Sequence, residues 1–383
     1  MISNTDLKVL GKGTYGCVFY PSINACNGKI EDDIDSGHYI TKIQQSQFLV
    51  DEYYEIEVGK LVQKIPLYYL YFAPVVKSCK INMVNMDYNL VKTCAYLQNE
   101  LGELNKKASY ISNKVRYVGK HILPAYIRTL DQSPEKLYRK MINTHLYILE
   151  AIQLLYEKHI IHFDIKPQNI VYDDIQNIPI IIDFGLARDI TSLTNPQFNL
   201  LQNEKTLHTT FINHYSYAYW CIDIHILSNM GTNNILKITE KVTTEKINKI
   251  LDGFFTSNLM AILSTDELNN FKDRITSYFS AYITREQTWQ SVYTDLIQYY
   301  NSWDNYSAAM TYLYTYYKCP VKSMSTDEYS DIDIDTEAEV DGKDARVMQQ
   351  YISILKNIVI SMPDTRQNAE QTREHILELV NTK

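Results

Sequence analysis

The fold of this chain is decided by eight residues near its middle, His162-Phe163-Asp164-Ile165-Lys166-Pro167-Gln168-Asn169. They contain a carboxylate, a lysine two residues after it and an asparagine five residues after it. A segment with helical periodicity precedes the run, and a short apolar strand follows it. A second strand leads into Asp183-Phe184-Gly185, nineteen residues after Asp164. Each polar residue alone would be an ordinary turn residue, so their order and spacing carry the information.

This order of residues fits phosphoryl transfer. That reaction needs positioned Mg²⁺, a group that orients the attacking hydroxyl, and cations beside the phosphates. Asp164 can orient a hydroxyl and accept its proton, and Lys166 can neutralise charge on the moving phosphoryl group. Asn169 and Asp183 can supply hard oxygen ligands to Mg²⁺. The conjunction therefore predicts a phosphotransferase site.

Two features upstream add to this prediction. Gly11-x-Gly13-x-x-Gly16-x-Val18 lies between two expected strands, where glycines let backbone N–H groups approach phosphate oxygens. A strand on both sides argues against a dinucleotide-binding fold, in which a helix would follow. Lys42 lies on an expected strand over Tyr39–Ile43, where a buried ammonium group needs an anion. Taken alone, Lys42 is more simply an edge-strand lysine that reaches water.

Strands are expected first along the chain, and helices later. Periodicity predicts a helix over residues 48–64, ended by Pro66, and a second helix over 134–158. Two short strands follow, and the second half is mostly helical, interrupted by an acidic segment that is expected to be a mobile loop. Without βαβ alternation, this order favours an α+β protein with two lobes.

The composition excludes several classes of protein. The net charge is −8, with no long basic run, so we expect no nucleic-acid partner. Six scattered cysteines argue against a zinc site and a disulfide framework, and favour reduced thiols in an intracellular protein. The sequence has no run of about 18 apolar residues and no signal-peptide pattern at its start, so no membrane association is expected.

The sequence resembles eukaryotic-type protein kinases, and more closely the divergent kinases of large nucleocytoplasmic DNA viruses. The likeness is carried by His162-Phe163-Asp164-Ile165-Lys166 and by Pro179-Ile180-Ile181-Ile182-Asp183-Phe184-Gly185. It implies one protein kinase domain over residues 1–383, with a small β-rich N-lobe (1–118) and a larger, mainly helical C-lobe (119–383). The acidic segment, at about 324–343, would then be a mobile insertion in the C-lobe.

The resemblance also implies a binding site for Mg-ATP. The nucleotide would be covered by Leu10, Gly11, Gly13, Gly16 and Val18. Lys42 would contact its phosphates and be held by a glutamate of the following helix. Of Glu52, Glu55 and Glu57, we choose Glu57, because Leu61 lies four residues later on the same helical face; Glu55 is the reserve.

Other expectations concern the support of the site. Asp223 is expected to begin the buried helix whose aspartate braces the catalytic loop. Phe163 replaces an arginine that in the family receives an activation-loop phosphate, so we expect no dependence on that switch. No Ala-Pro-Glu motif occurs between Asp183 and Asp223, which leaves Arg366 without its usual carboxylate partner. The hinge is placed at Val115–Gly119.

The expected function is a serine/threonine protein kinase with Asp164 as catalytic base and Lys166 and Lys42 as catalytic cations. By resemblance, Lys166 favours serine and threonine acceptors, and dual specificity stays open. The alternative is a pseudokinase that binds ATP as a scaffold; a small-molecule kinase fits less well. The expected partner is a protein substrate, and the location is the host cytoplasm or the virion if the protein is viral. The oligomeric state is left open.

Overall fold

The chain divides into two units, which are described separately. They are known from a computed structural model of residues 1–383. One unit comprises Met1–Lys120 with Ile180–Arg188, and the other comprises His121–Pro179 with Asp189–Lys383. The sequence predicts a boundary between the lobes after residue 118, and the lobe bounds stay a prediction. The structure describes residues 8–13, 16–23, 36–45, 49–81, 94, 97, 110–129, 134–173, 175–195, 200, 207, 210–211, 217–231, 236–255, 262–318 and 342–381.

The first unit contains a five-stranded sheet in the order β1-β2-β3-β6-β5, in which every neighbouring pair is antiparallel. Its strands are β1 (Lys8–Gly13), β2 (Gly16–Tyr20), β3 (Tyr39–Gln45), β5 (Val75–Ile81) and β6 (Tyr110–Arg116). The strands expected on either side of the glycine motif, and the one that carries Lys42, are confirmed. Gly16 is required by the sheet, because a Cβ there would lie 2.0 Å from the carbonyl oxygen of Ile43.

The expected helix of the first unit is α1 (Leu49–Val62), and 3₁₀ helices η2 (Ser36–His38) and η3 (Tyr68–Leu70) flank it in sequence. Val58 and Val62 are buried on one face of α1. Gly59 lies against the sheet, since a Cβ there would be 2.8 Å from the backbone oxygen of Val75. Beyond it, β4 (Phe72–Ala73) pairs in parallel with the end of β10 (Ile178–Ile182), which leads into η6 (Phe184–Leu186).

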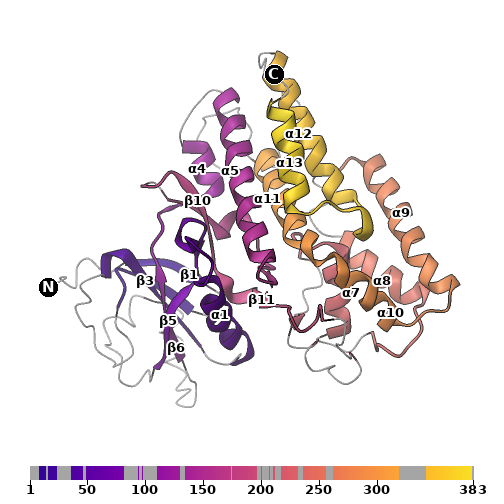
Figure 1. Cartoon of the computed structure of the whole chain (residues 1–383), viewed down its shortest axis with the longest axis horizontal. Helices are drawn as coiled ribbons and strands as arrows, with labels where there is room; N and C mark the ends of the chain where they lie inside the picture. The colour runs from indigo at the N-terminus through magenta and orange to yellow at the C-terminus, as the bar shows by residue number, and fades with distance from the viewer. Residues whose placement is uncertain are drawn as a thin grey trace. The chain divides into compact units, whose positions relative to one another are not determined.

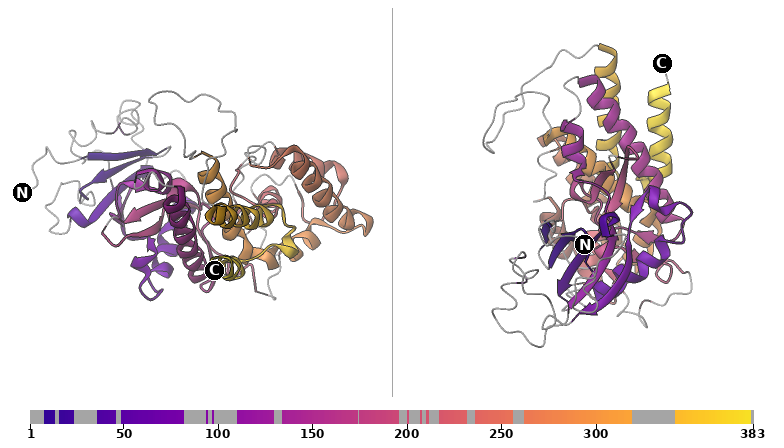
Figure 2. Two further views of the ribbon diagram at one scale, coloured as in Figure 1. Left: turned by 90° about the horizontal axis from the view of Figure 1, so that it is seen from above. Right: turned by 90° about the vertical axis from the view of Figure 1, so that its left-hand side faces the viewer.

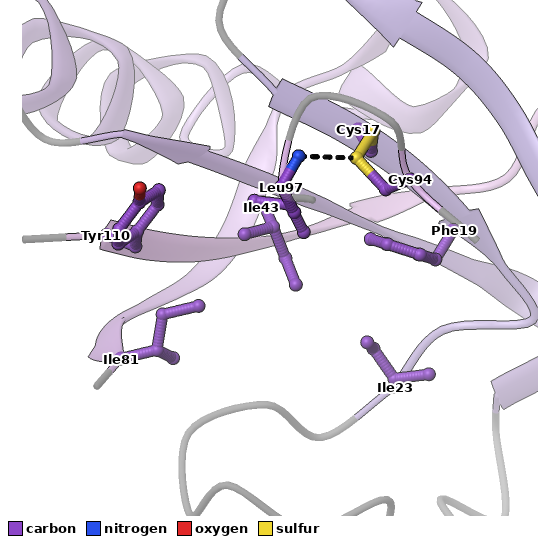
Figure 3. Close-up of a cluster of buried hydrophobic side chains, with 8 residues drawn as sticks. All are labelled: Cys17, Phe19, Ile23, Ile43, Ile81, Cys94, Leu97 and Tyr110. Carbon is purple, nitrogen blue, oxygen red and sulfur yellow. Dashed lines mark hydrogen bonds between the residues drawn. A yellow bond between two sulfur atoms is a disulfide. The ribbon is translucent and has the colours of Figure 1, made fainter. Parts of the chain in front are cut away.

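A disulfide joins Cys17 of β2 to Cys94 in the core of the first unit. Figure 3 shows both side chains in a buried cluster with Phe19, Ile43 and Leu97. Cys79 is disulfide-bonded as well. The expectation of reduced thiols is therefore wrong for these residues. Cys17 and Cys94 are 77 residues apart, so only the fold brings them together, and their spacing in the sequence gave no sign of it.

The second unit begins with short elements that precede and follow the long helix α5 (Pro134–Tyr156). They are β7 (His121–Ile122), α4 (Leu123–Thr129), β8 (Ile160–Ile161), η5 (Pro167–Asn169), β9 (Ile170–Asp173) and, at the boundary of the units, β11 (Arg188–Asp189). Strand β7 pairs with β9 in antiparallel register. The helix expected over residues 134–158 is confirmed by α5, and Met141, Ile148, Ile152 and Leu155 are buried on it.

The remainder of the second unit is helical (Figure 1). Its elements are α7 (Ile222–Gly231), α8 (Thr244–Phe255), α9 (Thr265–Thr284), α10 (Trp289–Leu296), η8 (Ile297–Ser302), α11 (Trp303–Lys318), α12 (Gly342–Ile360), η9 (Pro363–Thr365) and α13 (Ala369–Asn381). Helices α12 and α13 pack beside α5 (Figure 2). No helix within the described residues is long and apolar enough to cross a membrane. Most of the expected acidic insertion lies outside the described residues.

Candidate active site

Lys42 lies at the centre of an ionic cluster in the first unit. Its Nζ is 3.3 Å from Oε1 of Glu55 and 3.0 Å from Oδ1 of Asp183. Strand β3 places Lys42 between Val18 of β2 and Asn113 of β6. Burial alone would lower the pKa of Lys42, but the carboxylates of Asp183 and Glu55 raise it above its usual value. Lys42 is therefore a fixed cation held between two carboxylates.

Glu55 is the partner of Lys42, and our choice of Glu57 is wrong. Oε2 of Glu55 also accepts hydrogen bonds of 3.3 Å from Gln44 Nε2 and Asn113 Nδ2. Its side chain is only 3% exposed, whereas that of Glu57 is 39% exposed and pairs with Lys60 at 2.7 Å. Glu55, Val58 and Val62 share the buried face of α1. Two residues turn a helix by about 200°, so Glu57 faces away.

Asp183 follows strand β10 in a left-handed backbone conformation, with φ 63° and ψ 78°. The next residue, Phe184, is buried, with its ring edge-on to that of Phe72 at a centroid distance of 6.0 Å. The guanidinium of Arg188 donates to the backbone oxygens of Gly185 and Ala187. These contacts anchor the turn from both sides, and the side chain of Asp183 points to Lys42.

In the second unit, three side chains donate hydrogen bonds to the carboxylate of Asp164. Lys166 Nζ lies 2.9 Å and Asn169 Nδ2 lies 2.7 Å from Oδ2. Asn169 Nδ2 also donates to the backbone oxygen of Asp164 at 3.0 Å. The hydroxyl of Tyr217 donates to Oδ1. The structure thus brings together Asp164, Lys166 and Asn169 as the sequence predicted, and it adds Tyr217.

The backbone of the catalytic loop is braced by Asp304, the second residue of α11. Its carboxylate accepts hydrogen bonds from the backbone N–H groups of His162 at 2.7 Å and Phe163 at 3.0 Å. Burial raises the pKa of Asp304 to about 7, although these two N–H groups act in the opposite direction. A second residue of α11, Thr311, donates to the backbone oxygen of Ile165 at 3.3 Å. Helix α11 therefore supports the loop at two points.

Asp223 has another role, and its assignment as the bracing aspartate is wrong. Its carboxylate forms a paired contact with Arg366, with Oδ1–Nη2 at 2.9 Å and Oδ2–Nη1 at 3.0 Å. Both side chains are almost completely buried, and Trp303 Nε1 donates to Oδ2 of Asp223 at 3.0 Å. Arg366 therefore does have a carboxylate partner, contrary to our expectation.

Phe163 lies in a cluster of aromatic rings. Its ring centroid is 5.9 Å from those of Phe211 and Trp303 and 6.4 Å from that of Trp220. Trp220 Nε1 also donates to the backbone oxygen of Phe163 at 2.6 Å. The position where related kinases often have an arginine is therefore an apolar anchor for the loop.

The glycine motif is divided between two strands. Leu10, Gly11 and Gly13 lie in β1, and Gly16 and Val18 lie in β2. Residues 14–15 at the turn are outside the described residues. No group of three or more His, Cys, Asp or Glu side chains that could hold a metal occurs in the described part of the chain. Asn169 and Asp183 belong to different units, so their shared role as metal ligands stays a prediction.

Sequence reasoning missed Asp304 and Tyr217 for different reasons. Asp304 had a signal, because it lies in the first turn of a long helix that carries a buried stripe of Ala308, Tyr312 and other residues. We took the earlier aspartate because it lies at an ordinary distance from Asp183. Tyr217 is one of 32 tyrosines and has no motif that distinguishes it.

A lysine paired with a helical glutamate, an Asp-Phe-Gly turn, and a catalytic-loop aspartate bonded to lysine and asparagine are the features of the protein kinase fold. Residues 100–377 match the family model described as protein kinase domain, and the chain belongs to this family.

Curated relatives are similar to part of the chain. Serine/threonine-protein kinase 1 of African swine fever virus is 29% identical over 183 residues, which are 44% of this chain and 57% of the viral protein. Serine/threonine-protein kinase C of Synechocystis is 40% identical over 52 residues, which are 13% of this chain and 10% of that protein. The chain thus spans a little over half the length of the viral relative.

Proposed function

We propose that the chain is a serine/threonine protein kinase that transfers the γ-phosphate of Mg-ATP to hydroxyl groups of proteins. The observation that carries the proposal is the carboxylate of Asp164, held by Lys166 and Asn169 on a loop braced by Asp304. A base held in this way can orient an acceptor hydroxyl and take its proton. The names of the viral and cyanobacterial relatives support serine and threonine as acceptors.

We assign the nucleotide to the residues that the sequence predicts for it. Leu10, Gly11, Gly13, Gly16 and Val18 would cover it, and Lys42, held by Glu55, would neutralise its phosphates. Bound Mg²⁺ would neutralise charge on the phosphoryl groups. Asp183 would contribute a carboxylate oxygen to it. Asn169 would contribute its amide oxygen, because its amide nitrogen already donates to Asp164.

The partner in this proposal is a protein substrate, and the location is the host cytoplasm or a virus particle. The viral relative supports such an origin. A buried disulfide between Cys17 and Cys94 would persist more readily in a particle outside the reducing cytosol.

The proposal is tested by transfer of labelled γ-phosphate from Mg-ATP to casein, myelin basic protein and the kinase itself. Wild type is compared with Asp164→Asn, and with Glu57→Gln as a control on the exposed face of α1. Phosphoamino-acid analysis should find phosphoserine or phosphothreonine on casein or myelin basic protein with wild type and the control, and almost none with Asp164→Asn. Binding of Mg-ATP without transfer to a broad panel of proteins would contradict the proposal and support an ATP-binding scaffold.

A further inference from the structure

Both oxygens of the Asp164 carboxylate are occupied, by donors of different origin. Oδ2 accepts from Lys166 and Asn169, which belong to the same loop as Asp164. Oδ1 accepts from the hydroxyl of Tyr217, which lies 53 residues further along the chain. Lys166 and Asn169 hold the carboxylate at Oδ2, and Tyr217 is the donor at Oδ1.

The contact made by Tyr217 is the one that an acceptor substrate must make. In phosphoryl transfer, the attacking hydroxyl donates a hydrogen bond to the base that receives its proton. The Tyr217 hydroxyl makes this bond with Asp164 Oδ1, and Lys166 Nζ lies 5.8 Å from the centroid of its ring. A hydroxyl nucleophile, a base and a cation are therefore gathered at one point.

The segment that carries Tyr217 is held in place. The backbone oxygen of Tyr217 lies 3.2 Å from Nε2 of His225. Its ring lies edge-on to that of Trp220 at a centroid distance of 5.2 Å, and Trp220 in turn donates to the backbone of the catalytic loop. The phenol is thus presented to Asp164 by an anchored segment, at a high effective concentration.

We propose that Tyr217 is an acceptor for the protein's own phosphoryl transfer, within the same molecule. The inference rests on the proposed kinase function and extends it to one tyrosine. The phenol oxygen of Tyr217 forms a bond to the γ-phosphorus of ATP. The bond between that phosphorus and the β–γ bridging oxygen breaks, ADP leaves, and the phenol proton passes to Asp164. The phosphate on Tyr217 then repels the carboxylate of Asp164, so Oδ1 is released for the hydroxyl of a protein substrate.

Mass spectrometry of the whole chain tests this proposal. Phosphatase-treated wild type is incubated with Mg-ATP over a hundredfold range of protein concentration, and the phosphopeptide that contains Tyr217 is quantified with time. The variants are Tyr217→Phe, Asp164→Asn and, as a matched control, Tyr219→Phe, whose ring lies 5.6 Å from that of Tyr217.

We expect phosphate on Tyr217 in wild type and Tyr219→Phe, with a rate constant that does not change with protein concentration. Asp164→Asn should show at least tenfold less, and Tyr217→Phe should lose the phosphotyrosine signal from this peptide. Transfer to casein with Tyr217 unmodified would overturn the inference while leaving the kinase function intact. A rate constant that rises in proportion to protein concentration would overturn the claim of transfer within one molecule. Absence of transfer to casein and to the chain itself would overturn both proposals.

Discussion

At the scale of single residues, we expect the substitution of Glu by Gln to lower kcat/KM for ATP at position 55 and to leave it nearly unchanged at position 57. Glu55→Gln removes a negative charge beside Lys42, so it should lower kcat/KM for ATP roughly tenfold or more. Glu57→Gln alters an exposed pair with Lys60 and should leave kcat/KM within about twofold. Steady-state kinetics with varied ATP measures both. Equal losses for the two variants would show that Glu55 has no special role.

Because of His145, we expect the free energy of unfolding to depend on pH. It lies buried between Tyr351, whose hydroxyl is 2.9 Å from its Nδ1, and the ring of Tyr312, stacked at 4.3 Å. Burial lowers the pKa of His145 to about 3, from an ordinary value of 6.5. The unfolded chain therefore binds this proton more readily, and stability is lost as the pH falls from about 6.5 toward 3.

The contribution of His145 is measured with His145→Phe, which keeps a ring against Tyr312. Between pH 6.5 and 4.5, the free energy of unfolding of wild type should fall more steeply than that of the variant, by about 1.4 kcal/mol per pH unit. Urea unfolding at several pH values gives both slopes. Parallel slopes would mean that His145 takes up its proton in the folded protein as readily as in the unfolded chain.

The roles of residues within a sequence motif could be predicted. The roles that depend on tertiary packing were missed. Lys166 and Asn169 follow Asp164 within five residues, so their contacts are local. The choice between Glu55 and Glu57 depended on which face of α1 meets the sheet. Tyr217 reaches Asp164 only through the tertiary fold.

At the scale of elements, the buried pair of Asp223 in α7 with Arg366 connects distant parts of the second unit. Their side chains are 0% and 1% exposed. Arg366→Met leaves the charge of Asp223 buried without its partner and should cost about 3–5 kcal/mol in the free energy of unfolding. The control is Lys241→Met, which breaks a pair with Glu286 exposed by 62% and 75% and should cost far less. Chemical denaturation compares the two, and similar costs would contradict the structural role of the buried pair.

Because Asp304 of α11 braces the catalytic loop, we expect Asp304→Asn to lower kcat. The variant replaces one acceptor oxygen by an NH₂ group that faces a backbone N–H of the catalytic loop. We expect kcat to fall about tenfold or more with little change in KM for ATP, since the loss is in the orientation of Asp164. Asp295→Asn in α10, which affects only a bond with Tyr282, is the control. An unchanged kcat in Asp304→Asn would show that the loop holds its shape without this brace.

The same variant tests the pKa of Asp304. Burial raises the pKa of Asp304 from 3.8 to about 7 in the folded protein. As the pH rises between these values, the unfolded chain gives up this proton more readily than the folded protein. The free energy of unfolding therefore falls over this range. This part of the pH dependence should disappear in Asp304→Asn. The comparison is made by thermal unfolding at pH 5 and 7.

At the scale of the whole molecule, the disulfide between Cys17 and Cys94 crosslinks the chain over 77 residues. A loop of that length predicts a stabilisation of about 4 kcal/mol through the entropy of the unfolded chain. Reduction by dithiothreitol should therefore lower the free energy of unfolding of wild type by more than that of Cys94→Ser, which lacks this bond. Equal responses to the reductant would mean that the bond does not stabilise the first unit.

The order of strands and helices was predictable because periodicity and capping signals are local. Strands β1, β2 and β3 and helices α1 and α5 lie close to their expected positions. The disulfide and the contact of Tyr217 with Asp164 were not predictable. Each depends on contacts between residues far apart in sequence, which no local pattern reports.

Asp223 and Trp303 are 80 residues apart in sequence, and the hydrogen bond between them brings the two ends of the intervening segment together. When the two ends of a segment lie together, each doubling of its length costs only about 0.6 kcal/mol in loop-closure entropy. We therefore expect that changes in the length of helices α8, α9 and α10 leave the partners of Asp223 and Asp304 in place.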